Sequence, residues 1–231
     1  KPRFDGYLRL ALYNPHAAMQ LLTDCGNKAL SYLMRITPPT LLAPAAHIFD
    51  KYVTDTRLGI LDLLTHSTPV SSPATLQRAN LLAALPLDCG GLGQTTAIST
   101  SPYAFLASVR ATQHDRLLGT SSCQDALRRF TEPAYDLLTS AIGSPITNHP
   151  DILKVLPPTA RELARPIVNS SPNYKPTKKI QSVIGKVVSH NARLYLRTLA
   201  LPPIGTADTA AKASGTHLLL ATSRSQQSRM M

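Results

Sequence analysis

The chain has 231 residues, of which 43% are hydrophobic and 5% aromatic, and it carries a formal net charge of +11. This hydrophobic fraction excludes global disorder. The sequence contains no run of about 18 apolar residues, which is the length that a membrane-spanning helix needs. Three widely spaced cysteines without a CxxC pair support neither a zinc site nor a disulfide framework. Abundant leucine and alanine predict a mainly α, multi-helical fold. The nineteen prolines predict that the helices are short.

Helix starts and stops punctuate the first half of the chain. Asn14 followed by Pro15 predicts a helix start, because Asn caps free N–H groups and Pro tolerates the first helical position. Gly26 is expected to end this helix, and a break is expected at Gly59. Further helices are expected over residues 28–36, 44–57, 73–85, 100–110, 123–130, 133–141 and 159–168, and a last one over 207–221.

A glycine-rich segment at residues 86–96 predicts a turn, with room for one small β-hairpin. Gly90, Gly91 and Gly93 supply the conformational freedom of a structural turn. A phosphate-binding loop needs a lysine before its Ser or Thr, whereas Gln94 precedes Thr95 here. The segment also holds only half of a dinucleotide-binding fingerprint, so it predicts a structural role.

The helix expected from Thr177 to Leu199 has the clearest pattern in the chain. At about 100° per residue, its cations share one narrow stripe. The stripe contains Lys179, Lys186, His190, Arg193 and Arg197. The neighbouring face carries Ile184, Val187 and Leu194, which we expect to be buried. The sequence therefore predicts three parts: a helical lobe over 1–142, a connecting segment over 143–176, and a basic helical lobe over 177–231.

Positive charge is concentrated in the last third of the chain. Residues 151–231 hold twelve Lys and Arg against three Asp and Glu, whereas residues 1–150 are almost balanced. Such a field attracts polyanions. A cluster of Tyr174, Lys175, Lys178 and Lys179 adds a ring on which a base could stack. The alternative is a solvated surface that keeps the protein in solution.

Catalytic and metal-binding patterns are missing from the sequence. Polymerisation needs paired carboxylates that hold two metal ions, and the chain has no adjacent acidic pair. Its seven histidines show no metal-ligand spacing. We therefore expect no catalytic residue, no metal site and no cofactor within this chain.

Residues 85–109, LPLDCGGLGQTTAISTSPYAFLASV, resemble a block found downstream of the catalytic domain in non-LTR retrotransposon reverse transcriptases. Residues 21–39 are similar to the family segment with Cys-Gly, Tyr-Leu and Pro-Pro, and residues 47–50 and 216–223 to two shorter pieces. The chain departs from the family at Gln94, where a hydrophobic residue is expected.

The resemblance implies a fragment of an RNA-directed DNA polymerase without its chemistry. An upstream polymerase domain holding divalent metal would precede Lys1, and the protein would be intracellular, in nucleus or cytoplasm, away from membranes. We expect this chain to be the thumb and following helical region, a non-catalytic part that grips the RNA or DNA backbone of template or template–primer. The alternative is a helical protein–protein interaction scaffold with a basic solubilising face.

Overall fold

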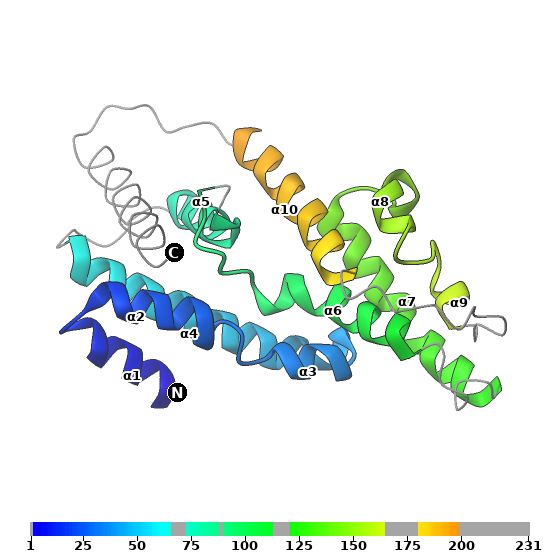
Figure 1. The fold of residues 1–231 in the computed structure, drawn as a ribbon, viewed down its shortest axis with the longest axis horizontal. Helices are drawn as coiled ribbons and strands as arrows, with labels where there is room; N and C mark the ends of the chain where they lie inside the picture. Colours follow the sequence, from blue (N-terminus) through cyan, green and yellow to red (C-terminus); the bar gives the residue numbers. More distant parts are fainter. Residues whose placement is uncertain (1, 66–72, 88–89, 113–120, 165–179, 199–231) are drawn as a thin grey trace, which may run out of the picture. The chain divides into compact units, whose positions relative to one another are not determined.

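The computed structural model describes residues 2–65, 73–87, 90–112, 121–164 and 180–198 (Figure 1). These residues form helices with connecting turns and contain no strand, so the predicted mainly α fold is confirmed. The chain divides into two compact units. Unit 1 comprises Lys1–Ala29, Phe49–Thr95 and Ala192–Met231, and unit 2 comprises Leu30–Ile48 and Thr96–Asn191.

The predicted three-part division does not coincide with these units. Its boundary at residues 142–143 falls within unit 2, and its boundary at 176–177 lies outside the described residues. The described helices are Pro2–Ala11 (α1), Pro15–Leu21 (α2), Ser31–Ile36 (α3), Pro39–Thr65 (α4), Pro73–Ala84 (α5), Ala97–Thr112 (α6), Ser121–Ile142 (α7), Pro150–Leu153 (α8), Ala160–Leu163 (α9) and Ile180–Thr198 (α10). A π-helix (η1) spans Leu22–Gly26, and a 3-10 turn (η4) spans Ile146–Asn148.

The helix starts predicted from the sequence are confirmed where side-chain caps form. The Asn14 side chain accepts a hydrogen bond of 3.0 Å from the backbone N–H of Ala17, and Pro15 is the first residue of α2. The Thr159 hydroxyl likewise accepts from the N–H of Glu162 at the start of α9, at 3.2 Å. These caps satisfy N–H groups that have no partner within the helix.

Several helices are longer than predicted, because residues expected to begin a helix or to separate two helices lie inside them. Pro44 and Gly59 lie within α4, Pro102 within α6 and Pro133 within α7. An interior proline costs about 3 kcal/mol in helix stability. Burying one large apolar side chain contributes about 1.5–3 kcal/mol, so the packed faces of these helices offset the local cost.

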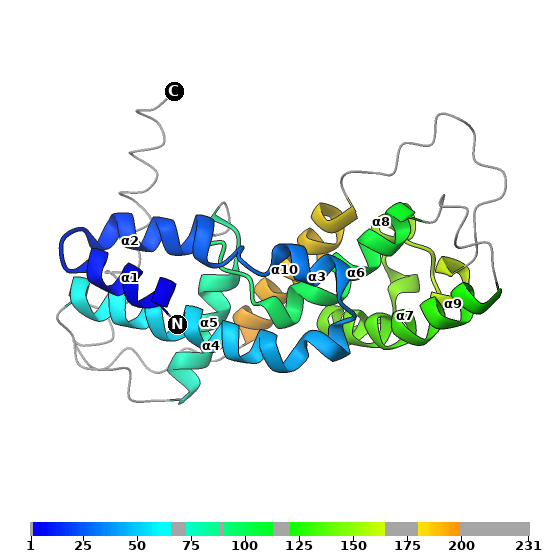
Figure 2. The same cartoon turned by 90° about the horizontal axis from the view of Figure 1, so that it is seen from below.

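Unit 1 is built around the aromatic side chain of Phe4. Its ring stacks on Tyr52 at a centroid distance of 5.6 Å and meets Phe49 edge-on at 5.8 Å. Leu22 and Ile60 are fully buried in the same cluster. These contacts join α1, η1 and the second part of α4, and both views show α1, α2 and α4 side by side (Figure 2).

Unit 2 has its own core, formed where α6 and α7 pack together. α3 packs against α6, and α9 packs against α7. The fully buried members of the cluster include Leu106, Leu138, Ile152, Leu163 and Ile184. η4 connects α7 to α8, and Ser144 Oγ and His149 Nε2 lie 2.7 Å apart across this turn. The first part of α10, through Ile184, thus belongs to the unit 2 core.

The glycine-rich segment after α5 forms an irregular turn, and its described residues contain no hairpin. The N–H of Gly93 donates to the Leu85 carbonyl at 2.8 Å, and the N–H of Gln94 donates to the Ala83 carbonyl at 2.9 Å. Gly90 and Gly93 have φ of 82° and 69°, values that favour glycine. The turn therefore folds back on the end of α5.

Candidate nucleic-acid interface

The face of α10 that packs into unit 2 follows the helical repeat. Ile180 and Ile184 are buried, and Val187 and Val188 are partly buried against the same cluster. The Asn191 side-chain amide donates a hydrogen bond to the Ile142 carbonyl at the end of α7. These contacts fix which side of α10 between Ile180 and Asn191 faces the protein and which faces solvent.

Exposed basic side chains occupy another face of the same helix. Lys186, His190 and Arg193 are all exposed, and their spacing of four and three residues places them on one face. We call these three residues the basic stripe. The remaining predicted binding residues, Tyr174, Lys175, Lys178 and Lys179, lie outside the described residues, and so does the side chain of Arg197.

One expectation about the buried face is wrong. Leu194 is 44% exposed, and Tyr195 beside it is also exposed. The spacing of seven residues from Val187 predicts burial for Leu194. However, α10 belongs to unit 1 from Ala192 onward, and there Leu196 is the buried side chain. The packed face changes along the helix, and a single repeat cannot show such a change.

The fully charged side chains of α10 are all positive. The helix contains no Asp or Glu between Ile180 and Thr198. On other described helices, several surface cations pair with acidic neighbours one helical turn away, as Lys51 does with Asp55 at 3.4 Å and Arg128 with Glu132 at 2.6 Å. No ion pair within the described residues involves Lys186 or Arg193. The basic stripe thus presents positive charge that no acidic side chain of its own helix offsets.

A buried polar network in unit 1 was not predicted. Arg57 is 4% exposed, and its guanidinium donates to Gln94 Oε1 at 3.4 Å and to Asn80 Oδ1. Gln94 Nε2 in turn donates to the Thr23 hydroxyl at 2.9 Å. Burial lowers the pKa of Arg57 to about 10, which leaves it charged at neutral pH. The signal was present in the sequence, because Arg57 lies between Val53 and Ile60 in the buried repeat of α4.

This network accounts for a polar side chain, Gln94, at a buried position of unit 1. Its amide links η1, α4 and the glycine-rich turn, and it accepts a hydrogen bond from a buried cation. A hydrogen bond to a charged group contributes more than one between neutral groups. Gln94 is therefore a structural residue of unit 1.

Replacing Gln94 with leucine should lower the free energy of unfolding by about 2–3 kcal/mol, because the buried guanidinium of Arg57 loses an acceptor. Chemical denaturation followed by circular dichroism measures the change. Gln20→Leu, at an exposed position of α2, is the matched control and should stay within about 0.5 kcal/mol of the unmodified protein. Adding Arg57→Met to Gln94→Leu should recover part of the loss, and an additive double variant would contradict the network.

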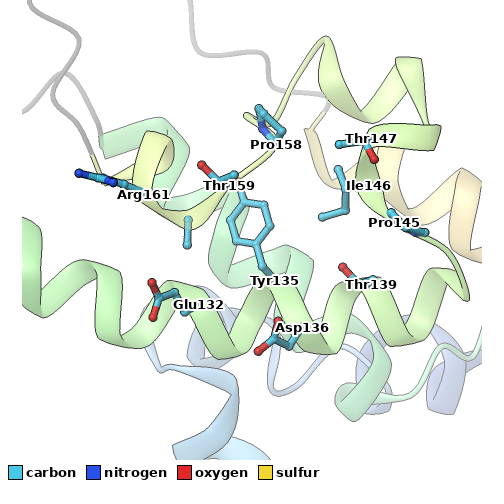
Figure 3. A pocket seen from close by; sticks show the side chains of 11 residues that line it. Glu132, Tyr135, Asp136, Thr139, Pro145, Ile146, Thr147, Pro158, Thr159 and Arg161 are labelled. Atoms are coloured by element: carbon cyan, nitrogen blue, oxygen red, sulfur yellow. The ribbon is translucent and has the colours of Figure 1, made fainter.

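Unit 2 also contains a hollow of about 340 Å³ between α7, η4 and the loop that leads into α9 (Figure 3). Tyr135 points from α7 into it, and its hydroxyl donates to the Pro157 carbonyl at 2.7 Å. Burial raises the pKa of Tyr135, so the phenol stays protonated at neutral pH and remains a donor. On the rim, Glu132 is paired with Arg128 at 2.6 Å. The Tyr135 contact holds the loop against α7, which is a structural role.

Within the described residues, no group of three or more His, Cys, Asp or Glu side chains is placed to hold a metal ion. None of the described helices combines the length and the apolar character that a bilayer crossing needs. Comparison of the chain with protein-family models, with curated proteins and with solved structures finds no match.

Proposed function

We propose that this chain binds the sugar–phosphate backbone of RNA or DNA through the basic stripe of α10. It would act as a non-catalytic nucleic-acid-gripping region of a retroelement reverse transcriptase, beside a polymerase domain in the nucleus or cytoplasm. Contacts to phosphates carry little sequence information, so the binding would be largely independent of sequence.

The observation that carries this proposal is the unbalanced charge of α10. The helix holds cations without a single acidic residue, and Lys186, His190 and Arg193 are exposed on one face. Lysine and arginine that neutralise phosphates release condensed counterions, which drives binding and makes it salt-dependent. The excess of cations in residues 151–231 adds a favourable long-range field.

Replacing Lys186 and Arg193 together with alanine should weaken binding to a labelled single-stranded RNA or an RNA–DNA duplex. The slope of log affinity against log salt should fall by about 2, one unit for each lost phosphate contact. Fluorescence anisotropy at several salt concentrations measures both quantities. Thermal melts should show unchanged stability, because both side chains are exposed.

The matched control removes the same amount of charge elsewhere. Lys51 and Lys154 are exposed and lie in surface ion pairs, so Lys51→Ala with Lys154→Ala lowers the net charge equally. The proposal requires this control to bind more tightly than the Lys186 and Arg193 variant. Equal binding by the two variants would assign the effect to net charge, and absence of binding at low salt would favour the scaffold alternative.

A further inference from the structure

His190 lies between the two fully charged members of the basic stripe. Its side chain is exposed, and it follows Lys186 by four residues and precedes Arg193 by three. The helical rise of 1.5 Å per residue places these steps at about 6 Å and about 4.5 Å along the axis of α10. A sugar–phosphate backbone that contacts both Lys186 and Arg193 therefore passes His190.

Within the described residues, no hydrogen bond or ion pair joins the side chain of His190 to a neighbour. Arg35 of α3 donates to Gln181, nine residues before His190 on α10. α7 meets α10 where the Asn191 amide donates to the Ile142 carbonyl, and the last acidic residue of α7 is Asp136, six residues before that carbonyl. Neither helix therefore supplies an acidic partner for the imidazole at this contact.

The ionisable groups of α6, η4 and α8 have other partners or stay neutral. A Cβ added at Gly185 would lie 3.9 Å from the Tyr103 hydroxyl of α6, and burial raises the pKa of Tyr103, so this phenol carries no charge at neutral pH. His149 is hydrogen-bonded within its own turn, and Asp151 lies in a surface ion pair. A ligand of the basic stripe is thus the group best placed to respond to the charge of His190.

The chemistry of imidazole gives this position a property that lysine and arginine lack. Histidine is the side chain whose charge ordinarily changes between about pH 5 and 8. A phosphate beside an imidazole favours its charged form, because opposite charges a few Å apart attract. The number of charges that a bound backbone meets on the stripe therefore depends on pH.

We infer that the basic stripe takes up a proton at His190 when it binds a sugar–phosphate backbone. The charged form is the one that the phosphate stabilises, so the affinity is highest at about pH 5.5 and falls as the pH rises toward about 8. This inference rests on the proposed function, because it describes a regulation of the same site. It adds a third phosphate contact in acid to the two that Lys186 and Arg193 supply throughout.

Fluorescence anisotropy with a labelled oligouridylate at about pH 5.5 and about pH 8 tests the inference. The internal phosphodiesters and the uracil bases of this probe keep their charge in that range, so a change in affinity comes from the protein. Binding should be about three- to tenfold tighter in acid, since tenfold corresponds to a change of one unit in a proton affinity. The slope of log affinity against log salt should be steeper by about 1 in acid.

Two substitutions of His190 give opposite results. His190→Gln should bind at both pH values as the unmodified chain binds at about pH 8. His190→Lys should bind at about pH 8 nearly as tightly as the unmodified chain binds at about pH 5.5, because its charge is permanent in this range. Calorimetry in two buffers with different ionisation enthalpies measures the proton uptake directly, and His190→Gln should abolish it.

The matched control is His47→Gln, which removes an exposed histidine from α4 and should keep the full pH effect. Thermal melts at both pH values check that the three variants remain folded. A His190→Gln variant with the full pH effect, or a His190→Lys variant that binds no more tightly at about pH 8 than the unmodified chain, would overturn the inference. The proposed function would still stand in both cases if replacing Lys186 and Arg193 weakens binding. Absence of binding at both pH values would overturn the inference and the proposed function together.

Discussion

Gly91→Ala is expected to prevent unit 1 from folding. A Cβ atom at this position would lie 1.9 Å from the carbonyl oxygen of Leu85 and 2.4 Å from its carbonyl carbon. Both are backbone atoms, so no side-chain rotation relieves the overlap. The turn cannot open freely, because the N–H of Gly91 donates to the Pro86 carbonyl at 3.0 Å and the N–H of Gly93 donates to Leu85.

The expected loss is about 4 kcal/mol or more, which is a large part of the usual stability of a domain. Urea denaturation followed by circular dichroism measures this loss, and limited proteolysis of residues 1–29 and 49–95 reports on unit 1 separately. A Gly91→Ala variant within about 1 kcal/mol of the unmodified protein would contradict the close approach to Leu85.

Two other glycines provide graded controls. Gly90 has a φ of 82°, but a methyl group added there would meet only open space, so Gly90→Ala should cost only about 1–2 kcal/mol. Gly6 lies within α1 with nothing within 4 Å of an added Cβ. Gly6→Ala should stabilise unit 1 by about 0.5–1 kcal/mol, because alanine loses less backbone entropy in a helix. The order Gly91, Gly90, Gly6 separates steric overlap from backbone conformation.

Local sequence signals predicted the fold class and several boundaries. Asn14 caps α2 as expected because the cap depends on atoms only a few residues apart. Pro44, Pro102 and Pro133 did not break their helices, because burial by residues far along the chain outweighed a local cost. Such burial is a property of tertiary packing, which single-helix propensities do not contain.

For the candidate site, the sequence likewise predicted local features and missed those that depend on tertiary contacts. The helical repeat of α10 places Lys186, His190 and Arg193 on one face, and all three are exposed. The network of Arg57 and Gln94 was missed because its members are 37 residues apart and become neighbours only in the folded unit.

Ile184→Asp is expected to unfold unit 2. Ile184 is fully buried in the cluster that contains Leu106, Leu138 and Ile152. Aspartate there would be an unpaired charge among apolar side chains, and the expected loss is about 4 kcal/mol or more. Chemical denaturation measures it, with limited proteolysis of residues 96–164 as the readout for unit 2.

The same replacement at other positions of α10 separates burial from charge. Lys186→Asp introduces the same side chain two residues away at an exposed position, so stability should change by about 0.5 kcal/mol or less while nucleic-acid binding falls. Leu194→Asp distinguishes the observed face from the face that the repeat alone predicts. Because Leu194 is 44% exposed, it should cost far less than Ile184→Asp. Equal losses at Ile184 and Leu194 would mean that both side chains are buried, and the face assigned to the basic stripe would then be wrong.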